Sequence, residues 1–187
     1  MSQNTAARTV TVNDHGKLDI RALVLLAILL AAGLILNFTV GKAISSMSAG
    51  MISPEFIISA FCLTILVIRP NVGQALVIGL ISAAVIQLTT TSPFIDFAAE
   101  GISAVVMALV VRAGMRGAAA KVTPLLGTFV TTLLSGVVFM LIKMAMVGAA
   151  AELAAAMLPV VFATAVFNAI LVQALYLPIK KALKIEE

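Results

Sequence analysis

Residue types that carry much of the chemistry of soluble enzymes are scarce in this sequence of 187 residues. It contains no tryptophan, one cysteine and one histidine. Cys62 has no second cysteine for an intramolecular disulfide, and its place within an apolar run predicts a buried small side chain. The sequence also lacks His-Glu-x-x-His, Cys-x-x-Cys and the phosphate loop Gly-x-x-x-x-Gly-Lys-Ser/Thr, which excludes the common zinc-protease and ATPase motifs.

Charged residues are also few. They make up 11% of the chain, apolar residues make up 62%, and the mean hydropathy is +1.18. Soluble domains contain roughly half apolar and a quarter charged residues. The composition therefore predicts an all-α integral membrane protein with a single membrane domain. At about 20 residues for each span, the length allows roughly six transmembrane helices.

Six prolines divide the apolar sequence into separate helices. Ser53-Pro54, Ser92-Pro93 and Thr123-Pro124 each resemble an N-cap followed by a first helical turn, where the N–H that proline lacks is not needed. Segment 148–157 is predicted to be either a short interfacial helix or a continuation of a neighbouring helix. The predicted transmembrane helices are 22–40, 54–69, 71–89, 95–115, 124–147 and 158–178.

Basic residues predict the orientation of these helices. If the N-terminus is cytoplasmic, ten of the twelve Lys and Arg residues lie inside, as the positive-inside rule requires. Both termini are then cytoplasmic, with polar tails at 1–20 and 181–187 on either side of the membrane domain 21–180. The net charge of +4 is accordingly a topology signal and not an indication of nucleic-acid binding. The ten inside residues are Arg8, Lys17, Arg21, Arg69, Arg112, Arg116, Lys121, Lys180, Lys181 and Lys184.

A polar segment, Gln87–Glu100, interrupts the apolar runs. It contains three consecutive threonines at 89–91, followed by Asp96 and Glu100 four residues apart. Charged residues at membrane depth cost roughly 2.5–3.5 kcal/mol each on insertion scales, so they usually face a cavity or each other. We therefore interpret the segment as one wall of a binding site.

Two motifs and the topology resemble a known family. Six short helices with both ends inside, and an Ala-x-x-x-Ala motif at Ala27 and Ala31, are similar to the S components of energy-coupling-factor (ECF) transporters. Met51-Ile-Ser-Pro-Glu55 and Leu88-Thr-Thr-Thr-Ser-Pro93 resemble the corresponding motifs of the tryptophan-transporter-type S components. Ser92 stands where those proteins have an aromatic residue.

The resemblance implies a function and partners. S components bind a small nutrient with high affinity in an outward-facing pocket, in the plasma membrane of a prokaryote. Tryptophan or a related amino acid is the ligand that the resemblance implies here. Ala27 and Ala31 would contact a transmembrane scaffold subunit, which carries two ATPase subunits. ATP would be hydrolysed by those partners, and this chain would hold no cofactor.

The polar residues agree with an amino-acid ligand. Glu100 or Asp96 would bind its ammonium group and Lys143 its carboxylate, while phenylalanines would flank an aromatic side chain. We predict no catalytic residues and no metal ligands. The predicted substrate-binding residues are Asn37, Glu55, Thr89, Thr90, Thr91, Phe94, Asp96, Phe97, Glu100, Phe139, Lys143 and Asn168.

Several of these residues have simpler interpretations. Glu55 and Asp96 also suit the first turn of a helix, where an acid interacts favourably with the helix dipole. Glu100 and Lys143 also suit a structural ion pair, and the phenylalanines suit plain packing. Gln173 is predicted to join helices by hydrogen bonding. Lys42 and Glu152 are predicted to be solvated loop charges.

Other functions remain as alternatives. A vitamin-specific S component would keep the fold and mechanism with a different ligand. A stand-alone secondary transporter would be favoured by an inverted repeat or by discontinuous helices. A structural membrane subunit is a third alternative. A membrane enzyme has little support, because His15 lies in the polar tail and Ser135-Gly136 has no visible base beside it.

Overall fold

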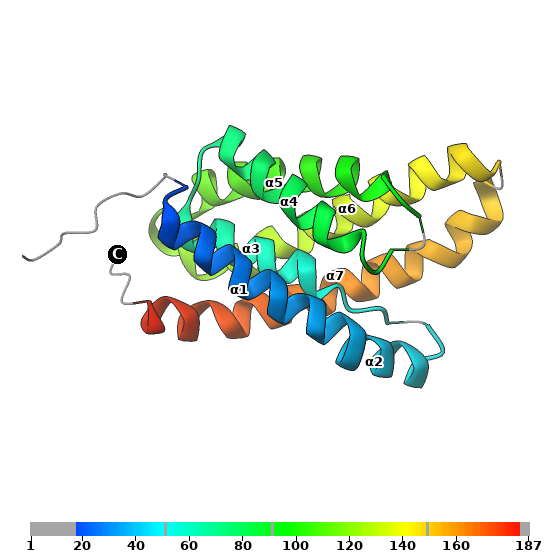
Figure 1. The fold of residues 1–187 in the computed structure, drawn as a ribbon, viewed down its shortest axis with the longest axis horizontal. Helices are drawn as coiled ribbons and strands as arrows, with labels where there is room; N and C mark the ends of the chain where they lie inside the picture. Colours follow the sequence, from blue (N-terminus) through cyan, green and yellow to red (C-terminus); the bar gives the residue numbers. More distant parts are fainter. Residues whose placement is uncertain (1–17, 51, 91, 149, 184–187) are drawn as a thin grey trace, which may run out of the picture.

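The computed structural model describes residues 18–50, 52–90, 92–148 and 150–183, and these residues form helices and connecting loops (Figure 1). Four helices are long and apolar enough to cross a membrane, and two apolar helices are shorter. This confirms the predicted all-α membrane class with six helices. The elements are α1 (Ile20–Leu36), a π-helical turn (Asn37–Gly41), α2 (Lys42–Met47), α3 (Phe56–Ile68), α4 (Val72–Ile86), α5 (Ile95–Gly114), a 3-10 turn (Gly117–Lys121), α6 (Thr123–Val147) and α7 (Ala150–Ala182).

Helix α3 lies at the centre of the bundle. Every residue from Phe56 to Val67 is buried, and α3 packs against α1, α4, α5, α6 and α7. In Figure 1 it runs between α1 on one side and the pair α4 and α5 on the other. A helix that is apolar on all sides is either buried in a core or in contact with lipid. The apolar sequence of this helix is compatible with its central position, which the packing of its neighbours determines.

The N-terminal end of α3 lies deep inside the bundle. The Asn168 side chain of α7 donates to the backbone carbonyl of Glu55 at 3.2 Å and to Thr132 of α6 at 3.5 Å. Helix α6 continues from Thr132 to Val147, which is about 22 Å at 1.5 Å per residue. With 13 residues, α3 spans only about 20 Å of a hydrocarbon core of about 30 Å. The longer neighbours therefore enclose a space beyond its end.

Small residues bring α4 and α5 into close contact. A Cβ atom at Gly79 would lie 2.6 Å from the carbonyl oxygen of Glu100, and Ala75 and Ala83 on the same face of α4 are fully buried. Helices associate in lipid through such close approach, because lipid offers little hydrophobic driving force. The small-residue face of α4 thus sets the position of α5 at Glu100.

The predicted helix start at residue 54 is wrong, whereas the start predicted at residue 95 agrees with α5 but lacks the predicted Ser92-Pro93 cap. Helix α3 begins at Phe56 and not at Pro54, and the Asn37 side chain accepts a hydrogen bond from the Phe56 N–H at 2.8 Å. A cap from another helix thus replaces the predicted Ser53 cap. Helix α5 begins at Ile95, two residues after Pro93, because Phe94 takes a left-handed conformation with φ of 72°. Of the three proline signals, only Pro124 lies in the first turn of its helix.

Two helices are longer than predicted. The first extends through the π-helical turn to Met47, where the prediction ended at residue 40. The last begins at Ala150, so the described part of 148–157 mostly continues this helix, with Pro159 and Pro178 inside it. Membrane helices tolerate proline because neighbouring groups satisfy the freed carbonyls. Lys42 and Glu152 are therefore exposed helical residues and not loop charges.

Candidate functional site

A cavity of about 380 Å³ lies beyond the recessed end of α3. The N-terminal ends of α3 and α5, the end of α4 and the middle parts of α6 and α7 form its walls. Its volume falls in the range of about 300–1,000 Å³ that is typical of small-molecule sites. The lining residues are Ser53, Glu55, Ile58, Ile86, Thr89, Thr90, Asp96, Glu100, Thr132, Ser135, Gly136, Phe139, Met157, Val160, Val161 and Thr164.

Two carboxylates lie on successive turns of α5. Asp96 is 6% exposed and Glu100 is 2% exposed. The Ser135 hydroxyl of α6 donates to Glu100 Oε1 at 2.8 Å, whereas Glu100 Oε2 is buried and has no hydrogen-bond partner among the described residues. A buried acceptor without a donor costs about 1–3 kcal/mol, and more when it is charged. Glu100 Oε2 is therefore an unsatisfied acceptor on a residue that lines the cavity.

Gln87 joins the polar segment to α5. Its side-chain amide donates to Asp96 Oδ2 at 3.3 Å and accepts from the Phe94 N–H at 3.0 Å. This amide stabilises the left-handed turn at Phe94 and at the same time orients the Asp96 carboxylate. Gln87 was part of the predicted polar segment but was not among the predicted site residues.

Two asparagines organise Glu55 without lining the cavity. The Asn37 amide donates to the Glu55 carboxylate while its oxygen accepts from the Phe56 N–H. Asn168 is fully buried and donates to the Glu55 carbonyl. Both predicted residues therefore act by positioning the end of α3, with Glu55 itself facing the cavity.

Six of the twelve predicted substrate-binding residues line the cavity: Glu55, Thr89, Thr90, Asp96, Glu100 and Phe139. Phe94 is 76% exposed and Phe97 is partly buried, but neither lines it. Thr91 lies outside the described residues. The sequence pattern thus identified the wall formed by α5 and the preceding segment, but not the direction of each phenylalanine.

Lys143 does not form the expected pair with Glu100. Its Nζ lies 5.6 Å from the centroid of the Phe139 ring, one turn back along α6, and within the described residues no ion pair joins it to Glu100. Helix α6 instead presents the Ser135 hydroxyl to Glu100. The prediction that the two charges lie at a similar depth is wrong, because Lys143 lies eight residues, or about 12 Å, beyond Ser135 along α6.

Hydroxyl groups of α6 and α7 are the main residues that the prediction missed. Thr132 and Ser135 line the cavity from α6, and the Thr164 hydroxyl of α7 donates to the Ser53 carbonyl at 2.9 Å. Thr128, Thr131, Thr132 and Ser135 are all buried and follow helical spacing. That spacing of hydroxyls in an apolar helix was the available signal.

The charge of the cavity is one-sided. Glu55, Asp96 and Glu100 line it, while none of its lining residues is Lys, Arg or His. The three carboxylates do not form a metal-binding group, as judged from the part of the chain that the structure describes. The lining is therefore chemically suited to a small organic ligand that carries a positive group, and the fold is that of a multi-pass membrane protein with an open, acid-lined cavity.

The family match agrees with this class. Residues 19–184 match the family described as Tryptophan transporter TrpP, and the chain belongs to this family. No curated protein and no solved structure matches the chain. The resemblance predicted from the motifs at 51–55 and 88–93 is confirmed, and the match also includes α6 and α7. Membership of a transporter family supports transport and not enzymatic catalysis.

Proposed function

We propose that the chain is the substrate-binding S component of an ECF-type importer and that it binds tryptophan or a related amino acid in the carboxylate-lined cavity. The observation that carries the proposal is Glu100, a buried acid with one unpartnered oxygen at a cavity of suitable size. The ligand ammonium group would complete the hydrogen bonding of this carboxylate. Family membership supports tryptophan as the first ligand to test.

The remaining lining residues suit the rest of an aromatic amino acid. Ile58, Ile86, Val160 and Val161 offer apolar surface to the indole ring. Phe139 offers an aromatic edge or face. These side chains come from four helices, so the ring would be enclosed and dehydrated on binding.

Lys143 is the proposed partner of the ligand carboxylate. It lies one helical turn beyond Phe139, a lining residue, and it is partly exposed. A lysine side chain is long and flexible, so a rotation about its own bonds would move the ammonium group past the Phe139 ring. We expect Lys143→Met to weaken tryptophan binding about tenfold, measured by titration calorimetry, because one partly exposed charge pair is lost. Tryptamine, which lacks the carboxylate, should bind wild type and Lys143→Met equally.

The partner and orientation are proposed from exposed surfaces. Ala27 and Ala31 are both exposed on α1, which leaves this small-residue face free for the transmembrane scaffold subunit. With both termini in the cytoplasm of a prokaryotic cell, the carboxylate-lined cavity lies toward the outer face of the plasma membrane. The two ATPase subunits on the scaffold would supply the energy, with no cofactor bound by this chain.

The experiment that tests the proposal is equilibrium binding to the detergent-solubilised chain alone. Tryptophan, tryptamine and indole-3-propionate are titrated separately, together with the common B vitamins. We expect tight tryptophan binding without ATP, weaker binding of tryptamine, and the largest loss for indole-3-propionate, which lacks the ammonium group. Tight binding of a vitamin would keep an S component but change its ligand.

A stand-alone secondary transporter is the second candidate. The observation that favours it is the cluster of three cavity carboxylates, because membrane-embedded acids also serve as proton carriers. Reconstitution separates the two functions. Tryptophan uptake that a proton gradient drives in vesicles containing this chain alone supports the secondary transporter, whereas uptake that requires the ATPase-bearing partners and ATP supports the S component.

A further inference from the structure

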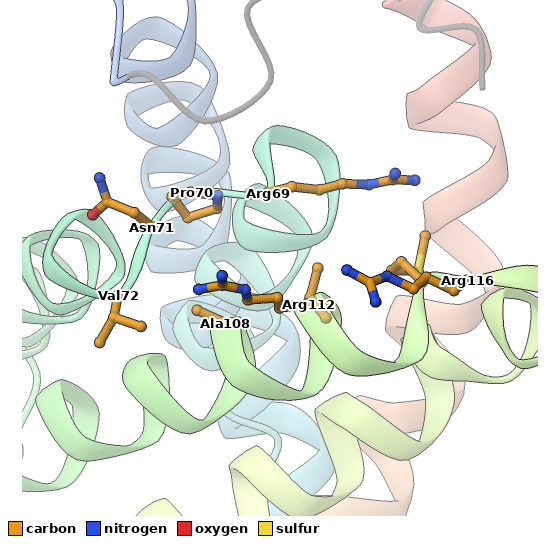
Figure 2. Close-up of a pocket in the computed structure, with 9 residues that line it drawn as sticks. Arg69, Pro70, Asn71, Val72, Ala108, Arg112 and Arg116 are labelled. Atoms are coloured by element: carbon orange, nitrogen blue, oxygen red, sulfur yellow. The ribbon is translucent and has the colours of Figure 1, made fainter.

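A second cavity lies at the opposite end of α3 and α5. Its volume is about 400 Å³, and it is lined by Arg69, Pro70, Asn71, Val72, Ala108, Val111, Arg112, Met115 and Arg116 (Figure 2). In Figure 2 the guanidinium group of Arg116 points toward Arg112, and that of Arg112 points toward Asn71 and Val72. Three positively charged side chains thus line one cavity, and in Figure 2 the Arg69 side chain extends in the direction opposite to Arg112.

Local structure brings these arginines together. Arg69 ends α3 in a left-handed conformation with φ of 54°, which turns the chain sharply toward the start of α4. Arg112 lies in the last turn of α5, and Arg116 follows that helix by two residues. Asn71 caps α4 through a capping box with Gln74. The arginines therefore meet at the junction of three helix ends.

The charge of this cavity is unbalanced. No Asp or Glu is among its lining residues, and among the described residues no side-chain hydrogen bond or ion pair joins any of the three guanidinium groups to the chain, although the Arg69 backbone N–H donates to the Ile65 carbonyl. Like charges so arranged repel one another unless an anion lies between them. A guanidinium group is planar and donates two parallel hydrogen bonds to a phosphate, which suits this site to a phosphate group.

The depth of this cavity in the membrane indicates which kind of molecule carries the phosphate. From Asp96 to Arg112, α5 rises about 24 Å, which is most of a hydrocarbon core of about 30 Å. The arginines therefore lie near the headgroup layer on the face opposite the carboxylate-lined cavity. Val72 and Leu76 of α4, 38% and 40% exposed, continue the wall toward the membrane centre and offer apolar surface to an acyl chain.

We propose that Arg69, Arg112 and Arg116 bind the phosphate of an anionic phospholipid, with its acyl chains against the exposed face of α4. Basic cavities between membrane helices at the cytoplasmic face are suited to such headgroups. The site is separate from the ligand cavity, so it holds whether or not tryptophan is the substrate.

The first test compares two lipids on the full-length wild-type chain. Native mass spectrometry of the detergent-solubilised protein with equimolar phosphatidylglycerol and phosphatidylcholine reports which lipid stays bound. We expect one phosphatidylglycerol molecule to be retained in preference to phosphatidylcholine. Equal retention of the two lipids would overturn the proposal, and it is the result expected if the arginines instead bind an acidic surface of a protein partner.

Variants locate the site on the chain. Arg112→Gln should reduce the preference for phosphatidylglycerol roughly fivefold, as expected for one interfacial basic residue. Arg112→Lys keeps the charge but not the two parallel donors, so it should give an intermediate preference. The matched controls are Arg21→Gln and Lys181→Gln, which remove one charge each at helix ends outside the cavity. An equal loss in the controls would show a general charge effect and overturn the site.

Inorganic phosphate distinguishes a lipid from a free anion. The same spectra are recorded with millimolar phosphate in the buffer. We expect phosphatidylglycerol to stay bound, because its acyl chains add contacts that phosphate lacks. Complete displacement by phosphate would identify a site for a free anion and overturn the lipid assignment.

Discussion

The two cavities at opposite ends of α3 and α5 differ in how their charges are held. In the carboxylate-lined cavity, Asp96 and Glu100 are buried and receive hydrogen bonds from Gln87 and Ser135. In the arginine-lined cavity, Arg112 and Arg116 are exposed. A fixed, dehydrated charge discriminates between ligands, because a wrong ligand leaves it unpaired. Exposed long side chains adapt to the shape of a headgroup, and they contribute to its binding affinity mainly through their charge.

Removal of the buried Glu100 carboxylate should have the largest effect on tryptophan affinity. Glu100→Gln keeps the shape and the contact with Ser135 but removes the charge that would face the ligand ammonium group. We expect tryptophan affinity to fall roughly thirtyfold or more, which corresponds to about 2 kcal/mol for a buried charge pair. Titration calorimetry measures this change. The control is Glu152→Gln, an exposed acid in the first turn of α7, which should leave affinity unchanged.

Displacement of α5 should have the next largest effect. Gly79→Ala places a methyl group 2.6 Å from the Glu100 carbonyl oxygen, so α4 and α5 must separate. We expect a loss of about 1–3 kcal/mol of stability from overpacking, measured as a lower midpoint of thermal unfolding. Tryptophan affinity should fall as well, because Glu100 moves with its helix.

Gly101→Ala is the matched control for this change. Its added methyl group would meet only the ends of two side chains, Leu76 at 3.3 Å and Leu80 at 3.6 Å, and both are able to rotate. An equal loss of stability and affinity in both variants would show that the close contact at Gly79 does not position Glu100.

Removal of a single hydroxyl should have a smaller effect. Ser135→Ala deletes the donor to Glu100 Oε1 and leaves the carboxylate in place. We expect tryptophan affinity to fall about fivefold, corresponding to about 1 kcal/mol for one hydrogen bond. Ser135→Thr keeps the hydroxyl and should restore most of the affinity. A loss in Ser135→Thr as large as in Ser135→Ala would assign the effect to packing.

The smallest effect on the ligand should come from the distant cavity. Replacement of Arg69, Arg112 and Arg116 by Gln should change tryptophan affinity less than twofold, because Glu100 and Arg112 lie about 18 Å apart along α5 and salt screens exposed charges beyond a Debye length of about 8 Å. Calorimetry in one buffer tests this directly. A loss of tryptophan affinity comparable to that of Glu100→Gln would mean that the two cavities are energetically coupled and do not act as separate sites.

Much of this architecture was predictable because lipid imposes simple rules on sequence. Composition indicated the membrane class, and the cost of burying Asp96 and Glu100 indicated that they face a cavity. The start of α3 and the capping of α5 were less predictable. Asn37 caps α3 from 19 residues away, a contact that local capping rules do not include.

The arrangement of side chains around each cavity depended on packing between distant helices. Ser135 reaches Glu100 across 35 residues of sequence, whereas Lys143, about two turns further along α6, lies over Phe139. Spacing along one helix does not give its rotation relative to another. For the same reason Arg69 and Arg112 were recognised as basic residues of one face but not as members of one cavity.

The emission of bound tryptophan tests the central claim most directly. The chain contains no tryptophan and one tyrosine, so excitation on the long-wavelength side of tyrosine absorption gives fluorescence from the ligand alone. If the carboxylate-lined cavity is the binding site, the ligand emission shifts to shorter wavelength, saturates at one molecule per chain, and loses this response in Glu100→Gln. Emission that stays at its value in water throughout the titration, or an identical response in Glu100→Gln, would contradict the account.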